Sequence, residues 1–202
     1  MQQRDEQLRQ SLLDMAAQDL SLREELAADG SLFEGYHPRM QQVHRRNAEG
    51  LLEIMRRHGW PGHSLVGEDG AEAAWLIAQH AIAEPDLQRR TLTLMKEAAQ
   101  RGEAQLWQAA MLEDRIRMFE GRRQLYGTQF DWDEWGEMSP YPEIEDVERV
   151  DERRHAVGLG PLQEDVARKR AAIKQSKERP PEDLVRRREE IEEWARAAGW
   201  RE

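Results

Sequence analysis

Hydrophobic residues recur along most of the chain at the three- and four-residue spacing that is typical of amphipathic helices. In residues 3–28, leucine and methionine alternate with charged side chains, and Asp29-Gly30-Ser31 then ends the pattern. The same spacing, bounded by glycine and proline, predicts further helices. They are expected at 39–58, 69–83, 85–102, 103–120, 146–157, 162–178 and 182–198. The pattern predicts a mainly α fold with a single domain that resembles a helical bundle.

Residues 124–144 have no helical period and are rich in aromatic side chains. Polar and aromatic residues alternate over 129–132, and a turn is indicated near 134–136, so a short β-hairpin or an irregular segment is expected here. The Gly- and Pro-rich stretch 59–67 is expected to be a shaped loop.

These elements suggest three parts of the chain. Residues 1–35 are expected to form an N-terminal amphipathic helix and loop, and residues 36–162 to form the helical core. Residues 163–202 are expected to form charged C-terminal helices. The two ends, 3–28 and 164–198, are amphipathic and could pack against a partner or a second copy of the chain.

The segment 69–83 is apolar on nearly every side, which is typical of a buried helix. Asp69 is expected to be its N-cap, with Glu72 in an approximate capping box. Near its end the segment places Gln79 and His80 next to each other. Burying an amide and an imidazole without partners costs roughly 1–3 kcal/mol each. We therefore expect these two residues to belong to a buried polar network.

Composition narrows the possible partners. The net charge of −10 argues against nonspecific nucleic-acid binding and against an anionic membrane surface. With no cysteine, disulfides and thiol nucleophiles are excluded. The N-terminus lacks the layout of a signal peptide, and no long apolar run suggests a membrane span. A soluble, cytoplasmic protein is expected.

Several short motifs occur in order along the chain. They are GWP at 59–61, WLIAQHA at 75–81, EDR at 113–115, YGTQ at 126–129 and ERRHAVGLGPL at 152–162. With these motifs, residues 40–162 resemble a bacterial family of uncharacterised proteins, domain of unknown function 6624. The resemblance implies a mainly helical fold and no established activity.

His80 and Asp114 are the candidate catalytic residues. Imidazole titrates near neutral pH and can act as a general acid or base, and a carboxylate in the apolar stripe around Asp114 needs a partner. Asp114 could orient His80. In the structural alternative, His80 is a satisfied core histidine, and Asp114 forms an internal salt bridge with Arg115, Arg153 or Arg154.

A second group of residues could orient a substrate. Arg115 could bind an anionic group, or form a surface ion pair. The YGTQ segment offers a phenol, a hydroxyl and an amide next to a flexible glycine, or it caps the preceding helix and begins a strand. The candidate substrate-binding residues are Gln79, Arg115, Tyr126, Thr128, Gln129 and Trp75.

Neither a metal nor a cofactor is expected from the spacing of ligand residues. No HxxxH, HxH or ExxH pattern places two ligands on one helical face, and His63 is far from His80 in sequence. Glu84 could join His80, with Asp114 or His155 supplying further ligands. The histidines at 37, 44 and 58 are expected at the surface or at helix ends. Phosphate-loop and dinucleotide fingerprints are absent.

Two functions remain open. The first is a small enzyme or enzyme-like binder of a small molecule, with a pocket between helices 69–83 and 103–120 that the 124–144 segment closes. In it, His80 and Asp114 carry out acid–base chemistry. The second is a non-catalytic module for protein–protein interaction or homo-oligomerisation through the terminal helices, with the polar network only fixing helix register.

Overall fold

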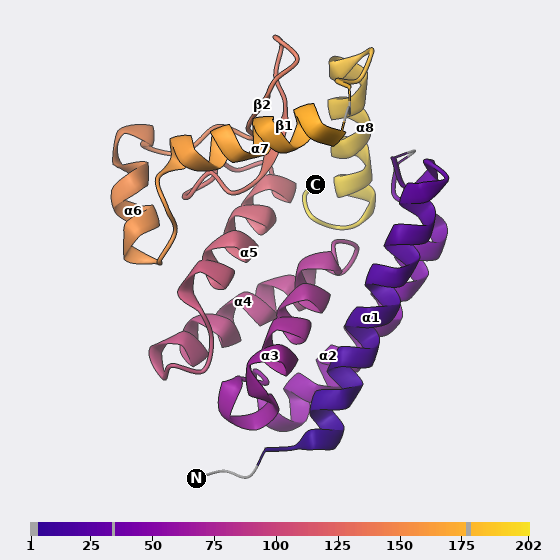
Figure 1. Ribbon diagram of the computed structural model, residues 1–202, viewed down its shortest axis with the longest axis vertical. Helices are drawn as coiled ribbons and strands as arrows, with labels where there is room; N and C mark the ends of the chain where they lie inside the picture. The colour runs from indigo at the N-terminus through magenta and orange to yellow at the C-terminus, as the bar shows by residue number, and fades with distance from the viewer. Residues whose placement is uncertain (1–3, 34, 177–178) are drawn as a thin grey trace. The chain divides into compact units, whose positions relative to one another are not determined.

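A computed structural model describes residues 4–33, 35–176 and 179–202 (Figure 1). This part of the chain is mainly α-helical, with one small two-stranded sheet, which confirms the expected fold class. The chain divides into two units, Met1–Gln105 (unit 1) and Leu106–Glu202 (unit 2). The boundary falls inside 36–162, the range that the sequence suggested as one core. No helix in the described residues has both the length and the apolar character to cross a membrane.

Unit 1 is built from long helices. They are α1 (Glu6–Ala28), the short 3₁₀ helix η1 (Ser31–Phe33), α2 (Pro38–His58), α3 (His63–His80) and α4 (Pro85–Gln100). Helix α1 begins at the N-cap Asp5, which accepts a hydrogen bond from the N–H of Leu8. Helix α2 begins at Pro38, one residue before the predicted start, and ends at His58 with Gly59 as its C-cap, as the sequence predicted. Helix α1 packs against both α2 and α3, so the N-terminal helix is part of the core of its own unit.

Helix α3 begins at His63 and not at the predicted Asp69. Glu103 satisfies its first turn, since its carbonyl and carboxylate accept hydrogen bonds from the N–H groups of His63 (3.3 Å) and Ser64 (2.8 Å). Gly67 interrupts the helix with φ 76°, a backbone conformation that favours glycine. The loop predicted for 59–67 is therefore helical in its second half, because a residue distant in sequence caps it.

Asp69 does not act as the predicted N-cap. Its carboxylate accepts a hydrogen bond from the N–H of Gly70 and pairs with Arg9 on α1. The helix also ends at His80, earlier than the predicted residue 83. The burial of this segment was predicted correctly, since Ile77, Ala78 and Gln79 are all buried.

Unit 2 combines shorter helices with a hairpin. Its elements are α5 (Leu106–Phe119), β1 (Phe130–Trp132), β2 (Met138–Pro140), the 3₁₀ helix η2 (Val147–Arg149), α6 (Val150–Ala156), α7 (Leu162–Ser176) and α8 (Leu184–Ala197). Strands β1 and β2 pair antiparallel, with Phe130 opposite Pro140 and Trp132 opposite Met138. The hairpin expected within 124–144 is thus confirmed.

Gly127 allows the YGTQ segment to pass close to the core of unit 2. Its φ is 66°, and a Cβ atom at this position would lie 2.6 Å from Cδ1 of Ile144 and 3.0 Å from Cδ1 of Leu162. A larger residue would therefore be strained in its backbone and would overlap its neighbours. Ile144 and Leu162 pack in a cluster with Val150 and Val166.

Candidate functional site

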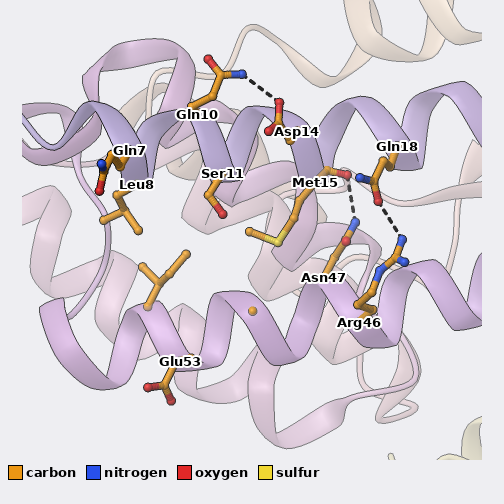
Figure 2. A pocket seen from close by; sticks show the side chains of 12 residues that line it. Gln7, Leu8, Gln10, Ser11, Asp14, Met15, Gln18, Arg46, Asn47 and Glu53 are labelled. Carbon is orange, nitrogen blue, oxygen red and sulfur yellow. Dashed lines mark hydrogen bonds between the residues drawn. The ribbon is translucent and has the colours of Figure 1, made fainter.

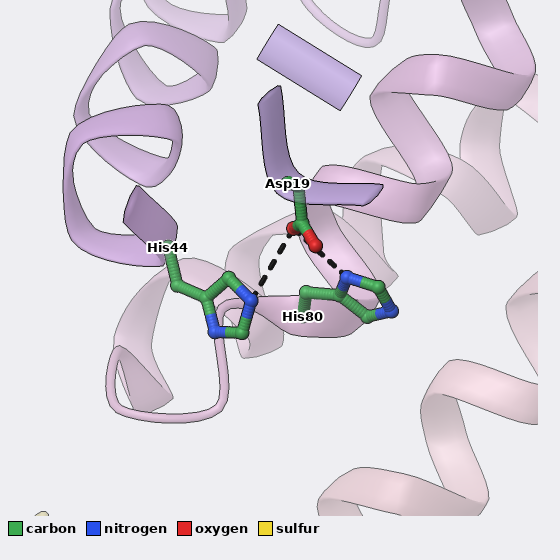
Figure 3. A group of neighbouring side chains, drawn as sticks. All are labelled: Asp19, His44 and His80. Atoms are coloured by element: carbon green, nitrogen blue, oxygen red, sulfur yellow. Dashed lines mark hydrogen bonds and ion pairs between the residues drawn. The ribbon is translucent and has the colours of Figure 1, made fainter. Parts of the chain in front are cut away.

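Three side chains from three helices of unit 1 meet at one point, which we name the Asp19 cluster. Asp19 lies on α1, His44 lies on α2, and His80 is the last residue of α3 (Figure 3). Oδ2 of Asp19 is 2.9 Å from Nδ1 of His80 and 3.3 Å from Nε2 of His44. One potential ligand atom from each residue lies within 4.8 Å of the other two.

The carboxylate of Asp19 is buried, with only 1% of the side chain exposed. Burial alone would raise its pKa, but the imidazoles of His44 and His80 outweigh that effect, so the pKa of Asp19 lies well below its usual range. Its other oxygen, Oδ1, is buried and accepts no hydrogen bond from the residues that the structure describes. A buried carboxylate needs a balancing positive charge, which either a protonated imidazole or a metal ion can provide.

His44 also contacts Tyr36, which precedes α2. The phenol oxygen of Tyr36 lies 2.8 Å from Nδ1 of His44, and the two rings stack with centroids 5.7 Å apart. Burial raises the pKa of Tyr36 above its ordinary value, and the negative charges of Asp19 and Glu84 raise it further. Tyr36 therefore presents a neutral hydroxyl to the outer nitrogen of His44.

His80 is placed by the way α3 ends. The side-chain amide of Gln88, a fully buried residue on α4, donates hydrogen bonds to the carbonyls of Ala78 (2.8 Å) and Gln79 (3.2 Å). These carbonyls belong to the last turn of α3, which has no partner for them within the helix. The side chain of His80 is 21% exposed, so this edge of the Asp19 cluster reaches solvent.

Replacing Gln88 with alanine is expected to lower the free energy of unfolding by about 2 kcal/mol, because two buried carbonyls lose their donor. Urea denaturation followed by circular dichroism would measure the change. Gln100→Ala on the same helix is the matched control, since Gln100 is exposed. Equal stability of the two variants would show that Gln88 does not hold the end of α3.

The geometry of the Asp19 cluster is compatible with a bound metal ion. Two nitrogen or oxygen ligands on one tetrahedral ion, each at 2.0–2.1 Å, lie about 3.3 Å apart. The separations of 2.9 Å and 3.3 Å in the cluster are close to that value. The three residues could therefore hold an ion after a small shift of their side chains.

Asp114, the predicted partner of His80, has a different environment. It lies on α5 in unit 2 and is fully buried. Its carboxylate accepts hydrogen bonds from the backbone N–H groups of Leu125 (2.7 Å), Tyr126 (3.1 Å) and Thr128 (3.0 Å), and from the Thr128 hydroxyl (3.0 Å). Burial raises the pKa of Asp114, while these donors favour its ionised form. Asp114 thus anchors the YGTQ segment, and Asp19 is the carboxylate that contacts His80.

The other predicted residues are divided between the units. Trp75 and Gln79 lie on α3, with Trp75 half-buried and Gln79 buried. In unit 2, Nε of Arg115 donates to Oε1 of Gln129 at 3.3 Å, and the backbone of Gln129 is held by Gln124. Helices α3 and α5, which were expected to enclose one pocket, belong to different units, and His80 and Asp114 each find partners within their own unit.

Two of the three arginines suggested as partners of Asp114, Arg153 and Arg154, donate hydrogen bonds to backbone carbonyls. Arg153 donates to the carbonyls of Leu125 and Glu145. Arg154 is fully buried, donates to the carbonyls of Gly160 (2.6 Å) and Tyr126 (2.7 Å), and pairs with Asp165. Through these contacts, the ERRHAVGLGPL segment (152–162) packs against the YGTQ segment (126–129).

Sequence reasoning missed Asp19, His44 and Tyr36. A signal was present for Asp19, because it lies seven residues after Leu12 and seven before Leu26, on the stripe that α1 buries. His44 similarly lies four residues after Met40 and four before Ala48, and all three are buried. His44 is therefore not the surface residue that was predicted, whereas His58 is exposed at the end of α2 as expected.

Unit 1 also carries a groove of about 830 Å³ between α1 and α2 (Figure 2). Leu8, Met15 and Ile54 contribute apolar surface to it, and polar residues such as Arg46 and Gln18 border it. Asp19, His44 and His80 do not line this groove. Its walls do not bring together groups suited to metal binding, so the Asp19 cluster is the candidate site.

Comparison with known proteins identifies a family but no characterised relative. No curated protein and no solved structure matches the chain. A sequence model of a family of unknown function, DUF6624, matches residues 6–174, a range that includes the Asp19 cluster and the Asp114 anchor. Because the match covers most of the 202 residues, the chain belongs to this family of unknown function, DUF6624.

Proposed function

We propose that the Asp19 cluster binds one divalent transition-metal ion and that unit 1 acts through this ion on a small molecule. The observation that carries the proposal is the meeting of one carboxylate and two imidazoles, supplied by three helices, with ligand atoms within 4.8 Å. The buried Oδ1 of Asp19 supports it, because this oxygen accepts no hydrogen bond from the described residues and a metal ion would give it a partner.

The chemistry of the three groups favours a transition metal. Magnesium and calcium prefer oxygen ligands, whereas imidazole suits zinc, iron, copper and nickel. Two imidazoles with one carboxylate occur as ligand sets of catalytic zinc and of non-haem iron(II). The proposed ion is therefore Zn²⁺ or Fe²⁺.

Three protein ligands leave a coordination position for water or substrate. A metal ion held in this way polarises a bound oxygen or lowers the pKa of a bound water. The side chain of His80 is 21% exposed, so solvent reaches this edge of the cluster. In this proposal His80 is a metal ligand, in place of the acid–base role that the sequence suggested.

The alternative of an interaction module has less support. It relies on the terminal helices being available to a partner. Helix α1 packs on α2 and α3, and α8 is attached to the hairpin through Arg187, which pairs with Asp131 at 3.4 Å, and Arg188, which donates to the carbonyl of Trp132. These contacts tie one face of α1 and part of α8 into their own units, although Ala195 is the one described residue that α8 buries.

Isothermal titration calorimetry of the protein, after a chelator has removed any bound metal, tests the metal proposal. We expect one equivalent of Zn²⁺ or Co²⁺ to bind, and Mg²⁺ to bind far more weakly. Asp19→Asn and His80→Ala should lose more affinity than the roughly 10- to 100-fold typical of outer-shell changes, because each removes a ligand. Circular dichroism of each variant verifies that it is folded.

His58→Ala is the matched control for these titrations. His58 is exposed and lies on the same helix as His44, outside the Asp19 cluster. It should bind metal as the unaltered protein does. The proposal would be overturned by an unaltered protein that binds neither ion, or by folded Asp19 and His80 variants that bind as tightly as the control.

A further inference from the structure

Tyr36 contacts the nitrogen of His44 that faces away from the Asp19 cluster. Nε2 of His44 is the atom directed at Asp19, at 3.3 Å, and Nδ1 lies 2.8 Å from the Tyr36 hydroxyl. The rings are stacked at an interplanar angle of 27°. The hydrogen bond at Nδ1 and the ring stacking therefore orient His44 so that its Nε2, which has no hydrogen-bond partner among the described residues, faces Asp19.

The backbone before α2 brings Tyr36 to this position. Gly35 has φ 90°, a turn conformation that favours glycine, and His37 is the N-cap of α2. Pro38 then begins the helix, and His44 follows within its second turn. Tyr36 and His44 thus lie eight residues apart, on the turn before α2 and on the helix itself, so their contact is local in sequence.

The two tautomers of neutral His44 need different hydrogen bonds from Tyr36, because Nδ1 accepts in one and donates in the other. Without a metal ion, a proton on Nε2 can be donated to Asp19, and Nδ1 then accepts a hydrogen bond from the Tyr36 hydroxyl. With a metal ion on Nε2, the proton must be on Nδ1, which then donates to the Tyr36 oxygen. A hydroxyl can serve both forms because it donates and accepts. Phenylalanine can serve neither.

We propose that Tyr36 is a positioning residue for the metal centre: its hydroxyl accepts a hydrogen bond from Nδ1–H of His44 in the metal-bound form and so holds the ring with its Nε2 lone pair towards the ion. This inference rests on the proposed metal site and adds the outer contact that metal-bound histidines usually have. His80 differs, because it uses Nδ1 towards Asp19 and its other ring nitrogen points away from the carboxylate (Figure 3).

Tyr36→Phe tests the inference, since it keeps the stacked ring and removes only the hydroxyl. Titration with Zn²⁺ and with Co²⁺ should show an affinity about 10- to 100-fold lower than that of the unaltered protein. The visible absorption of the Co²⁺ complex should also change, because the His44 ligand is oriented differently. Tyr141→Phe is the matched control, since Tyr141 lies in unit 2 beneath Arg188.

The outcomes separate this inference from the proposal beneath it. If the unaltered protein binds and Tyr36→Phe binds within twofold with the same Co²⁺ spectrum, Tyr36 has no positioning role and the metal centre stands. If the unaltered protein binds neither ion, the metal centre itself is wrong and the inference falls with it. A purely structural role would lower the thermal stability of metal-free Tyr36→Phe without changing the Co²⁺ spectrum, and that result also overturns the inference.

Discussion

Replacing Asp114 with alanine is expected to destabilise unit 2 by about 3–5 kcal/mol, because four donors that now point at one carboxylate lose their acceptor. Three of them are the backbone N–H groups of Leu125, Tyr126 and Thr128, and the fourth is the Thr128 hydroxyl. Urea denaturation followed by tryptophan fluorescence would measure the loss. Hydrogen exchange over residues 124–130 should rise in parallel, which assigns the effect to this segment.

Glu134→Gln provides the comparison for this prediction, since Glu134 is exposed in the hairpin turn. Its change in stability should stay within about 0.5 kcal/mol. If Asp114→Ala kept the stability and exchange rates of the unaltered protein but lost a ligand-binding signal, Asp114 would have the functional role that the sequence suggested. The hydrogen bonds lead us to expect the opposite.

The second large effect is expected at Arg154. Arg154→Met should cost about 3–5 kcal/mol, because it leaves the carbonyls of Gly160 and Tyr126 without their donor and the carboxylate of Asp165 without this buried cation. Burial lowers the pKa of Arg154, yet three acceptors surround its guanidinium. Thermal and urea unfolding of the purified variant would measure the loss.

Arg186→Met gives the matching surface substitution. Arg186 pairs with Glu190 within α8, and its side chain is 75% exposed. An exposed pair of this kind contributes about 0–1 kcal/mol. Similar losses at the two positions would contradict the structural role assigned to Arg154.

Most helices could be predicted from hydrophobic spacing, because each helix buries one face and its ends carry local signals. Gly59 and Pro85 are examples, and both lie where the sequence predicted a helix to end or begin. The start of α3 could not be predicted in this way. Its first turn is capped by Glu103, and no local pattern reveals a cap supplied from so far along the chain.

The candidate site was predicted only in part. His80 and Gln79 were correctly placed near the end of a buried helix, because an apolar run on all sides identifies burial. Asp114 was suggested as a residue that could orient His80, whereas the carboxylate that contacts His80 within unit 1 is Asp19. Periodicity shows which residues face inward but not which inward-facing residues meet. Asp114 is indeed buried, yet its donors are backbone N–H groups, which sequence patterns do not reveal.

The Asp19 cluster could not be predicted from ligand spacing for a related reason. Spacing reveals two ligands on one helix, whereas the three groups come one each from α1, α2 and α3. A search for polar residues on buried stripes would have found Asp19 and His44, which lie on the inward faces of their helices. The sequence therefore allows the burial of these residues to be predicted, but it does not show that they lie next to one another.

The origin of the Asp19 cluster in three helices has a consequence for how the protein folds. Asp19 and His80 are separated by 61 residues, so they meet only after α1, α2 and α3 have been made and packed together. Closing so long a loop carries an entropic cost that precedes any gain from the contact. The centre can therefore form only after the chain has been made at least as far as His80. A metal ion would bind to unit 1 after its helices have packed together. It would stabilise the folded unit and would not nucleate its folding.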